Sequence, residues 1–341
     1  MTNQTTEELD PLHDSDSGDG GGGGLRLGGL RMLNSWRTAG IAIPFLILFV
    51  TLSITSQPFL HTTNLINILD QQSATLCIAA AGTLVLVAGG IDLSVGATYG
   101  LATVVAGEIA AHHSPVLAIG AAILVGLFVG LINGLIVTVF KINALITTLA
   151  MSFVIGGLAV KVSGGNLIVL SSNSGFFKFA NAQFLTVPSA VWMTLVFVVI
   201  LGLLLSRTAF GRFTVASGGN AEAARLAGVR VNLIRVVAFT LSGGAAGLGG
   251  VIDISRLLSA QAGSGGNALA FTVLAGIVVG GTSIAGGEGS VWRTGIGVLF
   301  IALIGNGIDL LGVDPLYQQI VLGVILLIAV GLDSWARQRR R

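Results

Sequence analysis

Apolar residues run almost without interruption through most of this chain, in stretches separated by short polar or charged segments. A helix needs about 20 residues to span a bilayer, and lipid offers no partners for free backbone groups, so the pattern predicts membrane-spanning helices. The second and fourth stretches exceed the minimum length, and we expect a tilt or a break in each. The ten predicted spans are residues 38–56, 64–88, 95–112, 116–140, 144–161, 189–206, 233–252, 268–285, 293–309 and 316–333.

Composition supports this interpretation. Of the 341 residues, 53% are hydrophobic and only 9% are charged, against about 25% charged in soluble domains. So few charges exclude a cytosolic globular enzyme. The only cysteine, Cys77, lies inside an apolar stretch, which excludes a disulfide scaffold. We therefore expect an all-α polytopic membrane protein.

The two ends of the chain differ from the apolar middle. Residues 1–37 are acidic and glycine-rich, so we expect a disordered cytoplasmic tail. Residues 38–335 form the predicted transmembrane domain, which contains a long inner loop at 207–232. Residues 336–341 are a basic tail. Beside a membrane span, such a tail indicates a cytoplasmic anchor at anionic lipid rather than nucleic-acid binding.

The distribution of basic residues predicts the orientation. Ten spans place both termini on one side of the membrane. If that side is the cytoplasm, 14 of the 17 basic residues lie inside, and Lys161, Lys178 and Arg256 lie outside. This sorting follows the positive-inside rule and predicts a multi-pass protein of the cytoplasmic (inner) membrane.

Two further patterns concern helix packing and internal similarity. Gly126, Gly130 and Gly134 recur every fourth residue, a spacing that lets helix backbones approach closely within one subunit or, alternatively, between subunits. Residues 84–96 also resemble 275–291, and 131–136 resemble 303–308. This similarity suggests two weakly similar halves, with chance similarity as the alternative.

The sequence lacks the common motifs for nucleotide binding, zinc binding and nucleophilic catalysis. No lysine follows a glycine, so the chain has no Walker A motif and cannot bind ATP in that way. There is no H-E-x-x-H or G-x-S-x-G motif either. The sequence therefore indicates neither a hydrolase nor a metalloenzyme.

Polar residues inside the predicted spans are the candidates for function, because burying them is costly. Asp92 and Ser94 lie in the segment GGIDLSVG and either cap a helix at a tight turn or line a break beside a solute path. The patch Asp70-Gln71-Gln72 should face a cavity or another helix, and no basic residue is expected near mid-membrane to pair with it. We expect Asp253 to be solvated. Neutral groups that could bond a solute or another helix are Asn133, Asn143, Thr147, Thr148 and Ser152.

The inner loop contains a recognisable short helix. Gly218, Gly219 and Asn220 predict a turn in which Asn220 caps the helix that follows. Residues 221–229 form that helix, with Gly228 as its C-terminal stop. Its small apolar face suits a groove on a protein partner, and an interfacial helix is the alternative. That face consists of Ala223, Ala224 and Ala227.

These residues resemble a known family. Glu222-Ala223-Ala224, followed after three residues by Gly228, resembles the EAA-x3-G signature of ABC importer permeases. Residues 218–229 with GGIDLSVG resemble the ribose-type, or monosaccharide, branch, as do 131–150 and 275–287. The resemblance covers about residues 40–335. Ala238 and Ser242 depart from the wider signature, which has Ile and Pro at these places.

The resemblance implies partners and roles. Such permeases act in pairs, as two copies or with a paralogous permease, beside two ATP-hydrolysing subunits, and receive solute from an extracytoplasmic sugar-binding protein. It implies that this chain binds no cofactor, and that ATP and Mg²⁺ bind to the partner ATPase. It does not identify the sugar. The implied coupling residues are Gly219, Asn220, Glu222, Ala223, Ala224, Arg225, Ala227 and Gly228.

Two other functions are considered. An ion-coupled secondary transporter would need an acidic or histidine relay in the membrane, for which Asp70 and Asp92 are the only candidates. A non-transporting scaffold would gain nothing from costly polar groups in its spans. The translocation pathway expected for an importer includes Asp70, Gln71, Gln72, Asp92, Ser94, Asn133, Asn143, Thr147, Thr148 and Ser152.

Overall fold

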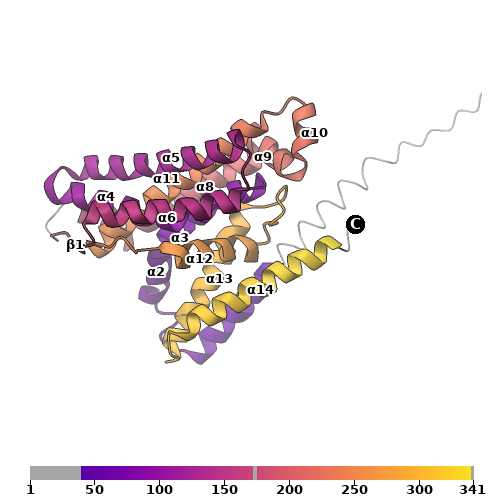
Figure 1. The fold of residues 1–341 in the computed structure, drawn as a ribbon. Coiled ribbons are helices and arrows are strands. Elements are labelled where there is room, and N and C mark those ends of the chain that lie inside the picture. The colour runs from indigo at the N-terminus through magenta and orange to yellow at the C-terminus, as the bar shows by residue number, and fades with distance from the viewer. Residues whose placement is uncertain (1–39, 172–174, 339–341) are drawn as a thin grey trace, which may run out of the picture.

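The computed structural model describes residues 40–171 and 175–338 as a bundle of α-helices (Figure 1). The predicted tail at 1–37 and the end of the predicted basic tail, 339–341, lie outside the described residues. An unlabelled first helix spans Gly40–Thr55. The others are α2 (Thr62–Gln71), α3 (Ser73–Val87), α4 (Val95–His112), α5 (Pro115–Val139), α6 (Ala144–Ser163), α7 (Phe177–Asn181), α8 (Ser189–Arg207), α9 (Ala209–Gly219), α10 (Ala221–Leu226), α11 (Val231–Leu257), α12 (Gly266–Val279), α13 (Val291–Leu310) and α14 (Tyr317–Gln338).

Two short antiparallel strand pairs fasten the long loop after α6. β1 (Ile168–Val169) pairs with β4 (Ser259–Ala260), which follows α11. β2 (Gln183–Phe184) pairs with β3 (Val187–Pro188) within the loop itself.

Each predicted apolar stretch contains a helix in the structure. The second stretch is interrupted at Gln72, which separates α2 from α3, whereas α5 in the fourth is unbroken. The eighth was predicted to reach residue 285, but α12 ends at Val279 because Gly281 adopts a φ of 80°. Among the described residues, the helices long and apolar enough to cross a membrane are α5, α6, α8, α11 and α13.

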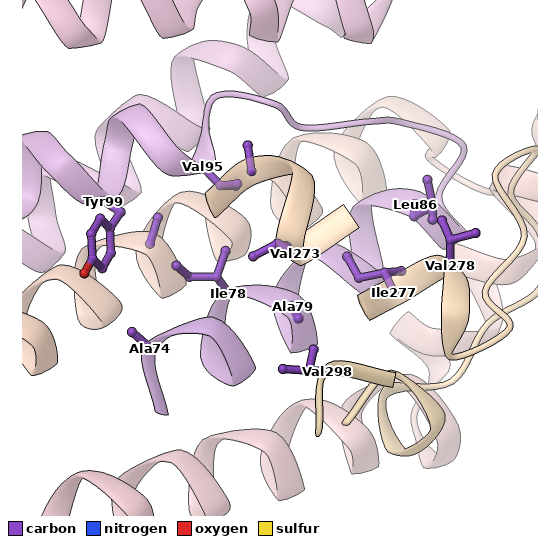
Figure 2. Packing of buried hydrophobic residues seen from close by; sticks show 12 residues of the cluster. Ala74, Ile78, Ala79, Leu86, Val95, Tyr99, Val273, Ile277, Val278 and Val298 are labelled. Carbon is purple, nitrogen blue, oxygen red and sulfur yellow. The ribbon is translucent and has the colours of Figure 1, made fainter. Parts of the chain in front are cut away.

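Helix α3 forms the centre of the bundle. All of its residues except Leu76 are buried. Figure 2 shows Ile78 and Leu86 of α3 packing with Val95 of α4, Val273 of α12 and other buried apolar side chains. A helix that is apolar all round is expected in such a position, because it has no face to offer to water.

Helices α5 and α11 pack closely along an extensive contact, and glycine makes this possible. A Cβ added to Gly130 would collide with the Phe239 carbonyl, and one added to Gly247 would lie 2.8 Å from the Ala122 carbonyl oxygen. Gly126 and Gly243 face each other. The glycine spacing therefore serves packing within one subunit, one of the two alternatives that the sequence left open.

The similarity between residues 84–96 and 275–291 has a local structural basis. Both α3 and α12 end in a Schellman motif: Gly90 N donates to Val85 O (2.9 Å), and Thr282 N donates to Ile277 O (3.2 Å). The other similar pair does not occupy equivalent places, because residues 131–136 lie two helices after the first motif and 303–308 lie in the helix directly after the second.

We predict that Gly130→Ala lowers the free energy of unfolding by about 1–3 kcal/mol, since the new methyl group forces α5 and α11 apart. Thermal unfolding of the detergent-solubilised chain measures this effect. The control is Gly120→Ala in the same helix, where an added Cβ meets nothing within 4 Å; this substitution should be neutral or stabilising. Equal stability of the two variants would contradict the packing role.

Candidate functional site

The short helix of the inner loop, α10, is capped at both ends. The Asn220 side-chain oxygen accepts hydrogen bonds from the backbone of Glu222 (3.1 Å) and Ala223 (3.0 Å), as predicted for an N-cap. At the other end Gly228 adopts a φ of 84° and donates to Arg225 O (2.9 Å). The helix ends at Leu226 rather than at the predicted residue 229. These caps stabilise a helix of six residues, which is too short to be stable in isolation.

Two predictions about this loop were wrong. Gly218 and Gly219 do not form a turn, because they lie in the last turn of α9, a helix that the sequence analysis missed. The predicted apolar face also differs, because Ala224 is buried against its own chain while Ala223 and Ala227 are exposed. The most exposed apolar side chain of the helix is Leu226, at 87%, which was not among the predicted coupling residues.

At the end of α9, three segments that are distant in sequence meet at glycines. We call Gly89, Gly218, Gly286 and Gly287 the glycine junction. Gly287 N donates to Val87 O (2.9 Å). A Cβ on Gly218 would lie 2.6 Å from Gly287 N, and a Cβ on Gly286 would lie 2.8 Å from Gly89 Cα. The junction thus joins the end of α9 to the end of α3 and to the loop between α12 and α13.

A second feature is the break between α3 and α4, which contains Asp92. One carboxylate oxygen of Asp92 accepts from Ser94 N (3.0 Å) and Ser94 Oγ (2.6 Å). The other accepts from Ser242 Oγ on α11 (2.9 Å). Asp92 therefore anchors the turn to α11, and both of its oxygens are used within the chain.

Helices α5 and α6 hold the same break from the other side. Asn133 Nδ2 donates to Ser94 Oγ (2.7 Å), and Leu93 N donates to Thr148 Oγ1 (3.1 Å). The backbone of a break inside lipid needs such partners. Among the alternatives for Asn133 and Thr148, the structure thus provides contacts between segments of the chain.

Among the described residues, the remaining neutral candidates make no hydrogen bond to another helix. Asn143 is the N-cap of α6 and accepts from Leu145 N (2.9 Å). Ser152 Oγ donates to Leu149 O (2.6 Å) in its own helix. Thr147 is buried, and its hydroxyl has no hydrogen-bond partner within the described residues. The structure does not bring these three side chains together at one point.

Asp70 lies in an ion pair that sequence reasoning excluded. Its Oδ2 is 2.8 Å from Nε of Arg256, in the last turn of α11. The Arg256 guanidinium is also 3.8 Å from Asp253. Asp253, which we expected to be solvated, has only 17% of its side chain exposed. No spacing rule could have found the pair, because its members are 186 residues apart.

The side chains of Gln71 and Gln72, unlike that of Asp70, line a cavity. This cavity has a volume of about 360 Å³ and lies between α2, α12, α13 and α14. The prediction that this polar patch faces a cavity or another helix is correct: Asp70 meets a helix, and the two glutamines face the cavity.

Comparison with known proteins decides the family. Residues 64–330 match a family described as the permease component of the branched-chain amino acid transport system. The ribose import permease protein RbsC of Bacillus subtilis is 43% identical over 85% of this chain and 91% of its own length. The L-arabinose ABC transporter permease protein AraH of Azospirillum brasilense is 38% identical over 89% of each chain. No solved structure matches.

The chain belongs to this permease family. The resemblance to monosaccharide ABC permeases is thereby confirmed: this is a multi-pass membrane permease of the sugar-importing kind, and its relatives are permease subunits rather than enzymes. RbsC of Escherichia coli K12 is likewise 36% identical over 86% of this chain and 92% of its own.

We predict that Gly218→Ala destabilises the permease by about 1–3 kcal/mol, because the added methyl group opens the glycine junction. The adjacent substitution Gly219→Ala is the matched control, since its Cβ would meet only Gly287 Cα, at 3.9 Å. Thermal unfolding in detergent measures both. A loss for Gly219→Ala as large as that for Gly218→Ala would contradict the role of the close contact, because alanine by itself favours a helix more than glycine does.

We also predict that Arg256→Gln costs more stability than Asp70→Asn. The first leaves two mostly buried carboxylates uncompensated, at about 3–5 kcal/mol, whereas the second leaves Arg256 beside Asp253. Unfolding temperatures of both variants test this order. The exposed Arg212→Gln is the control for loss of one positive charge, and the reverse order would refute the central role of Arg256.

Proposed function

We propose that this permease carries a monosaccharide, a ribose-like pentose or a related sugar, across the cytoplasmic membrane into the cell. Separate ATPase subunits hold the ATP and Mg²⁺ and drive the transport. Two permease subunits, identical or paralogous, form the path, and an extracytoplasmic sugar-binding protein delivers the solute. ATP binding and hydrolysis in the partner shift the permease between outward-open and inward-open states.

The exposed face of α10 carries this proposal. Leu226 is 87% exposed beside exposed Ala223 and Ala227, on a helix whose two caps fix its position. A leucine held out to solvent by a rigid turn has the form of an anchor for a groove on another protein. Its connection to the glycine junction supports a coupling role, because Asn220 directly follows Gly219 at the end of α9.

The positions of the basic residues support a cytoplasmic location for α10. Arg230 is the N-cap of α11, close to α10, whereas Arg256 lies in the last turn of the same helix. At 1.5 Å per residue they are about 39 Å apart, on the order of the bilayer thickness. Arg230 belongs to the residues assigned inside by the sorting and Arg256 to those assigned outside.

The relatives support a sugar as the solute. RbsC and AraH are named for ribose and arabinose, while the family description refers to branched-chain amino acids. We give the named relatives more weight because they match this chain at 38–43% identity over most of its length.

We predict that Leu226→Asp abolishes sugar uptake while the chain still inserts into the membrane. Loss of one central anchor costs about 2 kcal/mol or more, which weakens ATPase binding about thirtyfold. Uptake of radiolabelled D-ribose and L-arabinose by cells with the whole transport system measures activity, and copurification of the ATPase measures association. Glu222→Arg should act in the same direction.

The matched control is Leu185→Asp, which places the same charge at a leucine that is 71% exposed between β2 and β3. This variant should bind the ATPase normally. Normal uptake and normal ATPase association in Leu226→Asp would refute the coupling role of α10. Uptake driven by an ion gradient without nucleotide would instead favour a secondary transporter.

A further inference from the structure

The cavity lined by Gln71 and Gln72 is unusually rich in side-chain amides. Its volume is about 360 Å³, at the lower end of the range for small-molecule sites. Segments from α2, α12, α13 and α14 surround it. Its amide side chains are Asn64, Asn67, Gln71, Gln72, Asn306, Gln318 and Gln319.

Some of these amides form a fixed frame. Asn64 and Asn306 bond to each other reciprocally, with Nδ2–Oδ1 distances of 3.2 and 2.9 Å. Asn64 also donates to the Phe59 carbonyl (2.9 Å), and Gln318 donates to Asp309 (2.9 Å). These bonds connect α2 to α13 and α13 to α14, so the walls of the cavity are held in place.

Four other lining amides are available: Gln319 on α14, and three at α2. Within residues 40–171 and 175–338, the side chains of Asn67, Gln71 and Gln72 make no hydrogen bond. Each amide offers two donor hydrogens and two acceptor lone pairs. The three at α2 lie on or just after this one helix, at positions that face the cavity. The fixed frame thus presents a row of free groups that both donate and accept.

The lining selects a class of solute. Asp309 is the only ionisable side chain among the lining residues, and Gln318 already bonds it. A zwitterionic amino acid would leave its carboxylate without a basic partner among the lining residues, at a cost of several kcal/mol. A sugar hydroxyl donates and accepts, as an amide does. Apolar neighbours such as Ile68, Ile301 and Ile325 suit the C–H surface of a sugar ring.

We infer that this cavity binds the transported solute, which is a neutral monosaccharide. The side chains of Asn67, Gln71 and Gln72 contact it. The inference rests on the proposed function, because the orientation proposed above places the cavity toward the outer side. The cavity also lies at the opposite end of α3 from the glycine junction. The 15 residues of that helix separate the two by about 22 Å.

Cysteine protection in the full-length permease tests the site directly. The only native cysteine, Cys77, is 0% exposed and provides a silent background. Asn67→Cys is treated in membranes with an impermeant maleimide, with and without D-ribose, L-arabinose or L-leucine. We expect one or both sugars to suppress labelling and leucine to have no effect. Gln183→Cys, on the exposed strand β2, should be labelled without protection.

A second substitution identifies the contact. Adding Gln71→Leu to Asn67→Cys should raise the half-protecting sugar concentration about fivefold to tenfold, since one hydrogen bond is lost. Adding Gln183→Leu should leave that concentration unchanged. Labelling that no solute affects, protection by leucine alone, or equal shifts for both added substitutions would overturn the inference.

The experiments distinguish a failure of the cavity as a binding site from a failure of the proposed function. Absence of nucleotide-dependent sugar uptake by the unsubstituted transport system would refute that function, whatever the labelling shows. Normal uptake without sugar protection at Asn67→Cys would refute only the cavity as a binding site.

Discussion

Direct contact between backbones, with no side chain between them, is the constraint on which this structure depends. Helices α5 and α11 meet along facing glycines, and the ends of α3 and α9 meet the loop between α12 and α13 at the glycine junction. In lipid, where apolar burial drives helix association only weakly, such close packing supplies much of the attraction. The high glycine content, 50 of 341 residues, is thus a requirement of the packing as well as of the turns.

The same close packing divides the polar residues of the membrane region into two kinds. At the break between α3 and α4, both carboxylate oxygens of Asp92 and the hydroxyl of Thr148 bond to the chain itself, as does Nδ2 of Asn133. In the cavity, Asn67 and Gln71 keep theirs free within the described residues. Since an unsatisfied polar group in an apolar medium is costly, the free groups are the ones that a passing solute can use, and sequence alone could not separate them.

Local features were predictable from the sequence, and contacts between distant segments were not. The ten apolar stretches predicted where helices form, and the Asn220 cap with Gly228 predicted a short helix, because these signals lie within one or two turns. Helix α9 was missed because its glycine-rich sequence resembles a loop until packing buries Gly211, Thr214 and Ser217. The Asp70–Arg256 pair depends on how α2 meets α11. The exposure of Leu226 depends on which face of α10 meets its own chain.

The position of α3 connects the two ends of the proposed mechanism. One end of α3 lies at the glycine junction, where it meets the end of α9, and the other follows Gln72 at the cavity. Close-packed interiors transmit displacement rather than absorb it. Because α3 is buried along almost its whole length, a shift imposed at Gly89 cannot be relaxed by bending into free space. The interruption between α2 and α3 is the first place along this path where the helix is not continuous, and Gln72 lies there. The proposed coupling through α10 would therefore act on the same side chains that we assign to the sugar.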